Sequence, residues 1–192
     1  MKQNNNGQMI LNGLAETREF FEQVSLLIRT AEEDFREKGW ELISSSSECS
    51  DVTRQLSRPQ KWMPRWVARL FINDEHENIL IYVGVLLDRV GSWAGFREPW
   101  ITCGLFEYLS GKNPHVNWDL NWVTTHLESE KDPDGKFNLR EYPPMERESE
   151  SILKESTMAL PLVEITDANA LKQKIIVPLL EEISNICRTD DE

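Results

Sequence analysis

The sequence predicts an α+β fold: a mainly antiparallel sheet of six or seven strands, flanked by an N-terminal and a C-terminal helix. Apolar, strand-like segments follow one another between Trp62 and Leu127, and this block holds six of the seven tryptophans. The turns between these segments are short, which favours antiparallel neighbours over β-α-β units. A stripe of apolar residues with helical spacing precedes the block and another follows it, so helices are expected to cover one face of the sheet.

The first helix is predicted from Leu14 to Lys38, because its apolar residues recur at helical intervals and form one stripe. The stripe consists of Phe20, Phe21, Val24, Leu27, Ile28, Ala31 and Phe35. Gly39 follows, where a helix commonly ends in a left-handed residue. Residues 1–13 are rich in Asn and Gln and are predicted to be a flexible start.

The sheet is predicted to open with a hairpin. Trp66–Ile72 reads as one strand, the polar residues 73–78 as a turn, and Ile79–Asp88 as the returning strand. Because Ile79–Asp88 has apolar residues on both of its faces, it is expected to lie inside the sheet, covered on both sides.

Further strands are expected on either side of this hairpin. They are Trp40–Ile43, Trp100–Leu109, Val116 towards Leu127, Phe137–Tyr142 and Met158–Ile165. Pro161 cannot donate a backbone hydrogen bond, so the last of these strands is expected at an edge of the sheet or with a bulge. Residues 143–154 begin with proline and are rich in glutamate, and we predict a solvated linker or a short exposed helix there.

The second helix is expected to begin with Thr166 or Asp167 as its cap. Its buried stripe would consist of Leu171, Ile175, Leu179, Ile183 and Ile186. Pro178 is expected to kink this helix, or to restart it with the proline in the first turn. Residues 14–188 then form a single domain and 189–192 an acidic tail. This outline is similar to that of helix-grip and profilin-like folds, a likeness of architecture that says nothing about function.

Composition bounds the class of protein. The chain has 192 residues, 40% of them hydrophobic and 28% charged, as in an ordinary soluble domain. Its net charge of −12 disfavours binding to nucleic acid or to anionic membranes and is compatible with a basic partner. Cys49, Cys103 and Cys187 form no CxxC pair, which indicates reduced thiols. Without a signal-like or bilayer-spanning apolar run, the protein is expected to be cytoplasmic, with no membrane contact.

Sequence patterns for catalysis or cofactor binding are missing. No glycine motif for phosphates, dinucleotides or a nucleophilic serine occurs. His76, His115 and His126 have no neighbours at metal-ligand spacing. We therefore predict no metal and no cofactor, assign no catalytic residue and favour a non-enzymatic role.

A basic segment from Arg54 to Arg69 is the first candidate binding feature. Arginine and lysine are interleaved with tryptophan there, and guanidinium with indole suits a phosphate, a carboxylate or a stacked base. The candidate binding residues are Arg58, Lys61, Trp62 and Arg65. The favoured alternative is structural: the arginines pair with the protein's own acids, and the indoles belong to the core.

The loop from Arg89 to Trp100 is the second candidate. Large aromatic rings in a loop cost free energy unless they fold back onto the core or meet a partner, and Gly91 and Gly95 let the loop reorient. The candidate binding residues are Arg89, Trp93, Phe96, Arg97 and Trp100. A lid over a pocket, a partner-binding tip and a plug at the end of the core are the three interpretations, and functional and structural roles are evenly balanced.

These features predict a non-enzymatic binding or regulatory module that engages a protein partner or a ligand through the aromatic loop. The first alternative is a small-molecule pocket between sheet and helices, in a carrier or a cofactor-free enzyme. A weaker alternative is a nucleic-acid accessory protein that acts through residues 54–69. A homodimer is among the candidate assemblies.

Overall fold

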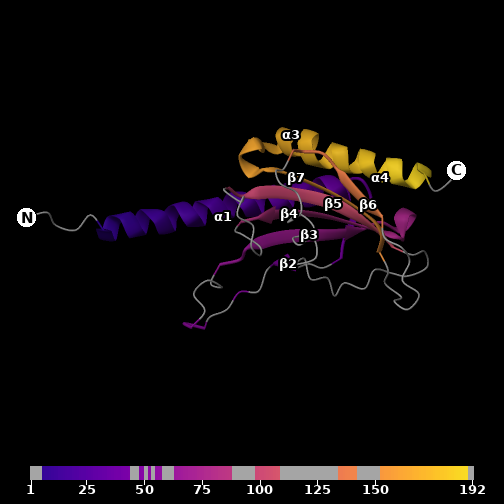
Figure 1. The fold of residues 1–192 in the computed structure, drawn as a ribbon. Coiled ribbons are helices and arrows are strands. Elements are labelled where there is room, and N and C mark those ends of the chain that lie inside the picture. Colours follow the sequence, from indigo (N-terminus) through magenta and orange to yellow (C-terminus); the bar gives the residue numbers. More distant parts are fainter. Residues whose placement is uncertain are drawn as a thin grey trace, which may run out of the picture.

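The computed structural model describes residues 6–43, 48–49, 52, 55–57, 63–87, 98–108, 134–141 and 152–189 (Figure 1). The N-terminal helix α1 spans Asn6–Arg36. The strands are β1 (Glu41–Leu42), β2 (Glu48–Cys49), β3 (Trp66–Ile72), β4 (Ile79–Leu86), β5 (Trp100–Tyr108), β6 (Asn138–Glu141) and β7 (Ile152–Pro161). The C-terminal helix (residues 168–189) is made of α3 (Ala168–Leu171), a π-helical turn (Lys172–Ile176) and α4 (Val177–Thr189). Short 3-10 helices span Asp74–His76 and Leu162–Glu164.

The strands form one antiparallel sheet in the order β1-β3-β4-β5-β7-β6, and β2 pairs with β3 outside this path. With a helix at each end of the chain, this confirms the predicted α+β class. The finer likeness to helix-grip or profilin-like folds stays a prediction. The strand predicted from Val116 towards Leu127 lies outside the described residues.

The predicted hairpin is confirmed. β3 and β4 pair from Trp66 opposite Leu86 to Ile72 opposite Leu80. On its other side β4 pairs with β5, and every residue of β4 is buried. The strand that is apolar on both faces is therefore an interior strand of the sheet, covered on both sides.

Both helices lie on the same face of the sheet (Figure 1). Their apolar stripes and the side chains of that face form one buried cluster, in which burial of apolar area supplies the main stabilising term. The opposite face has a second cluster, which includes Trp66, Tyr82, Trp100 and Phe106 and to which none of the helices in the described residues contributes. In the described part of the chain, no helix has the length and hydropathy needed to cross a bilayer.

The first helix is longer than predicted. α1 begins at Asn6 rather than at Leu14, so helical backbone extends into the segment that was expected to be flexible. The difference arises because the Asn and Gly residues of this segment have low helix propensity, although Ile10 and Leu14 continue the helical spacing of the later apolar residues.

β7 also differs from prediction, because it covers Ile152–Pro161 rather than Met158–Ile165. Its first half is polar, and two of the polar side chains there have partners on neighbouring elements. The Nζ atom of Lys154 lies 3.1 Å from a carboxylate oxygen of Glu107 on β5, and the hydroxyl of Ser156 donates to Glu182 on α4 at 2.6 Å. Partners of this kind allow polar residues inside a sheet.

The expected edge position of this strand is wrong, since β7 lies between β5 and β6. Pro161 is tolerated as its last residue because β6 pairs only with the stretch from Lys154 to Thr157 and stops short of the proline. The register shift between β5 and β7 occurs at the other end of β7, next to Tyr108.

The C-terminal helix begins with the predicted cap. The carboxylate of Asp167 accepts a hydrogen bond from the Ala170 N–H at 2.8 Å. Pro178 lies in the first turn of α4, which confirms the predicted restart. The Val177 N–H bonds to the carbonyl of Lys172, five residues back. This wider turn separates α3 from α4, because proline lacks an N–H and its ring crowds the preceding turn.

Candidate functional site

One end of the sheet gathers the segments that carry both sequence-predicted candidates; we call it the loop end. There, Trp66 at the start of β3 lies opposite Leu86 at the end of β4, which in turn lies opposite Trp100 at the start of β5. The carbonyl of Arg65 accepts a hydrogen bond from the Leu87 N–H at 2.6 Å, which extends the pairing beyond β3. The basic segment therefore enters the sheet at the same end at which the segment between β4 and β5 leaves and re-enters it.

Most of the residues predicted to bind a partner fall outside the described residues. These are Arg58, Lys61, Trp62, Arg89, Trp93, Phe96 and Arg97. Trp100 is only 5% exposed and belongs, with Trp66, to the cluster on the face away from the helices. Its ring is part of the core at the loop end, and a binding role for it stays a prediction. Arg65 is half-buried at this end.

Arg69, at the end of the basic segment, follows the structural interpretation. Its Nε atom lies 3.6 Å from a carboxylate oxygen of Glu32 on α1, and both side chains are largely buried. Glu32 also forms an ion pair with Arg36 within the helix. This cluster joins β3 to α1, so one cation of the basic segment is engaged with the protein's own acids.

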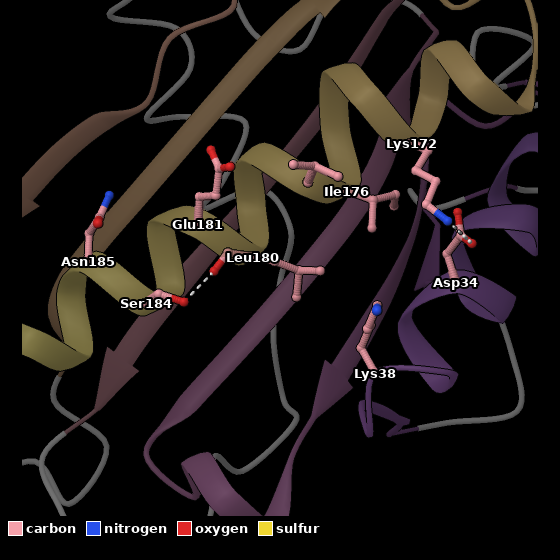
Figure 2. A pocket seen from close by; sticks show the side chains of 9 residues that line it. Asp34, Lys38, Lys172, Ile176, Leu180, Glu181, Ser184 and Asn185 are labelled. Carbon is pink, nitrogen blue, oxygen red and sulfur yellow. Dashed lines mark hydrogen bonds and ion pairs between the residues drawn. The ribbon is translucent and has the colours of Figure 1, made fainter.

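A groove between the two helices is a further candidate, which the sequence does not reveal. It encloses about 430 Å³, within the range typical of ligand sites. Figure 2 shows its walls: the C-terminal end of α1 with the turn that follows, and the π-helical turn with α4. The lining residues are Asp34, Lys38, Lys172, Ile176, Val177, Leu180, Glu181, Ser184 and Asn185.

The groove combines an apolar floor with charged groups at its rim. Ile176 is buried and Leu180 is half-buried. The Nζ atom of Lys172 lies 4.0 Å from a carboxylate oxygen of Asp34, so this pair bridges the two helices. The amine of Lys38 makes no ion pair with any residue the structure describes. An uncommitted amine beside an apolar floor suits a ligand with an anionic group on an apolar body.

The thiols have different surroundings. Cys103 is completely buried, and burial raises the pKa of its thiol, so this cysteine stays protonated and unreactive at neutral pH. The sulfur of Cys187 lies 3.8 Å from Nδ1 of His76, and the His76 ring stacks on Trp40. These contacts join α4 to the β3–β4 connection. No three His, Cys, Asp or Glu side chains of the described residues are grouped as metal ligands.

Similarity to known proteins gives no indication of what this protein binds. Comparisons of this protein with family models, with curated proteins and with solved structures give no match.

Proposed function

We propose that the protein is a non-enzymatic binding module that engages a protein partner at the loop end of the sheet. The observation that carries this proposal is the meeting of two segments: the basic segment enters β3, and the 88–99 segment connects β4 to β5, at one end. Aromatic rings and guanidinium groups are the groups enriched at the centres of protein interfaces. The net charge of −12 additionally favours a partner with a basic surface.

The packing of the core supports this function over a pocket between sheet and helices. The side chains that face each other across this space include Phe35, Val83, Leu105 and Leu179, all of them fully buried. A carrier or an enzyme with an internal site needs several hundred Å³ in such a position. The groove described above opens instead on the outside, between the helices.

Truncation of the loop rings tests the proposal. With Trp93→Ala and Phe96→Ala combined, the protein is expected to keep a melting temperature within a few degrees of wild type, because recognition residues contribute little to the core. The same variant is expected to lose the partner that co-purifies with the wild-type protein. Thermal unfolding measures the first quantity, and native mass spectrometry of protein purified from its own host measures the second.

Trp100→Ala is the matched contrast, since its ring is buried at the same end of the sheet. Truncating a buried aromatic ring costs about 3–5 kcal/mol, so this variant should melt far below wild type. If the loop double variant shows a similar fall while the partner is still bound, both rings belong to the core and the proposal is wrong.

A small-molecule site in the interhelical groove is a second candidate function. Its apolar floor beside the uncommitted amine of Lys38 favours it. The matching ligand has an apolar body and one anionic group, the combination that the floor and the amine recognise together.

Binding of the fluorescent anion anilinonaphthalene sulfonate tests the groove. Lys38→Gln is expected to weaken binding by roughly three- to tenfold, because an exposed charge-assisted contact contributes about 1 kcal/mol. Lys174→Gln is the control, since Lys174 lies on the C-terminal helix that forms the other wall but pairs with Glu164, outside the groove, at 2.8 Å. Equal dye affinity of Lys38→Gln and wild type would rule out the groove as the anion site.

A further inference from the structure

The first helix is longer than the sheet it covers. Its 31 residues correspond to about 46 Å at 1.5 Å per residue, whereas the ten residues of β7 span about 33 Å. Its C-terminal end is held by the stacking of Trp40 on His76 and by the pairing of Glu41 with Ile72. The N-terminal half of α1 therefore projects past the sheet, as Figure 1 shows.

One apolar seam runs along both halves of this helix. Its members are spaced alternately by four and three residues, which is the spacing of a coiled-coil seam. They are Ile10, Leu14, Thr17, Phe21, Val24, Ile28, Ala31 and Phe35. The last four are buried against the sheet and the C-terminal helix, whereas Ile10 is 62% exposed and Leu14 61%. The seam that closes the core thus continues, without a partner among the described residues, onto the projecting half.

The projecting tip is a poor helix by itself. Gly7 and Gly13 have no atom within 4 Å of where a Cβ would lie, and each glycine in an exposed helix costs about 1 kcal/mol relative to alanine. Helical stability in such a segment comes mainly from packing of its apolar face. Met9 and Leu11 add to the exposed apolar surface of the tip, so packing against a partner would offset the low propensity.

The lack of charge on the projecting tip favours a second copy of the chain as its partner. No charged residue occurs between Gly7 and Ala15, in a chain whose net charge is −12. The tip therefore has no basic residue to attract an anionic lipid surface and no charge of either sign to select a foreign helix. A second copy of the chain, in contrast, has the same seam spacing. Because the tip is uncharged, electrostatic repulsion does not oppose its pairing with that copy.

We propose that the exposed seam of α1 pairs with the seam of a second copy, antiparallel and about a two-fold axis. With the axis between Leu14 and Thr17, residues 9–15 of each copy face residues 16–22 of the other. The charged residues of this half are Glu16, Arg18, Glu19 and Glu22. Each of them then faces an uncharged segment, whereas a parallel pair would place the same acids opposite each other.

The dimer is expected to be weak and reversible. The paired segments make only a few helical turns, which places the interface at the low end of the size range, below about 1,200 Å². The seam residues Ile10, Leu14 and Thr17 belong to neither of the two segments on which the proposed function rests. The seam variants therefore test the dimer, whereas the Trp93 and Phe96 variant tests the proposed function.

Sedimentation of the full chain from about 1 µM to several hundred µM tests the proposal. The wild-type protein is expected to show a monomer–dimer equilibrium. Ile10→Lys and Leu14→Lys should each raise the dimer dissociation constant at least about tenfold, with the melting temperature unchanged. Leu26→Lys is the matched control: Leu26 is 59% exposed on the opposite side of the same helix, and its replacement should leave the constant unchanged.

Label distances test the orientation. With the three cysteines replaced by alanine and a nitroxide at Gln8→Cys, the two labels of an antiparallel dimer lie about 22 Å apart along the axis, whereas those of a parallel dimer are neighbours. A wild-type protein that stays monomeric over the whole range would overturn the proposal. So would a dimer that resists both seam variants, or one that Leu26→Lys weakens equally. Neighbouring labels, or a monomer whose seam variants lose binding to anionic vesicles, would also overturn it.

Discussion

Replacement of Val83 by aspartate is expected to destabilise the protein strongly. Val83 is 0% exposed in the middle of β4, opposite Arg69 on β3 and Cys103 on β5, and it faces the two helices. The guanidinium of Arg69 already pairs with Glu32, so an aspartate at position 83 adds a buried charge without a partner of its own. Such a charge costs about 3–5 kcal/mol, a large part of the 5–15 kcal/mol by which a domain is typically stable. Urea unfolding followed by circular dichroism measures the loss.

Val163→Asp is the control for this substitution. The same chemical change is made at a position that is 71% exposed, just after β7, and surface changes of this kind stay within about 0.5 kcal/mol. A Val83→Asp protein with the unfolding midpoint of wild type would show that β4 is not the covered central strand described here.

The addition of one methyl group at Gly104 is expected to be almost as damaging. A Cβ on this residue would lie 2.6 Å from the carbonyl oxygen of Ser156 and 2.7 Å from the ring of Tyr82. The carbonyl belongs to β7 and cannot move without shifting the strand. Overpacking of a core typically costs 1–3 kcal/mol, and a clash with backbone places Gly104→Ala near about 3 kcal/mol.

The same substitution at Gly13 is expected to have the opposite effect on the free energy of unfolding. Open space surrounds a Cβ at this position in α1, and alanine is the better helix former, so stability should rise by up to about 1 kcal/mol. Both variants are compared by urea unfolding at low protein concentration. A neutral Gly104→Ala would contradict the close approach of β5 and β7 at this residue.

The sequence predicts best those elements whose burial follows a simple period. Trp66–Ile72 is predicted with its observed bounds, and β4 ends at Leu86, within the predicted strand. Apolar residues on both faces of β4 also predict its interior position in the sheet. The polar half of β7 is missed for the opposite reason. Its lysine, glutamate and serine read as solvated, and only the folded chain brings Glu107 and Glu182 next to them.

Of the two candidate sites, the loop end could be predicted from the sequence and the groove could not. The loop end follows from strand order, because antiparallel neighbours place the start of β3, the end of β4 and the start of β5 together. The groove does not follow from any local pattern, since its walls come from residues 34–38 and 172–185. Each of its lysines and carboxylates looks like an ordinary exposed residue until the two helices lie side by side.

The contact between the two helices determines when the core can close during synthesis of the chain. Asp34 on α1 meets Lys172 on the C-terminal helix, which is synthesised later, and both helices close the same face of the sheet. Until residues 168–189 leave the ribosome, the part of this face that the C-terminal helix covers stays exposed, together with the side of the α1 stripe that packs on that helix. The nascent chain therefore exposes part of this apolar surface until the C-terminal helix is made, which favours aggregation at that stage. Folding then depends on contacts between the most distant parts of the sequence, the kind that form slowly.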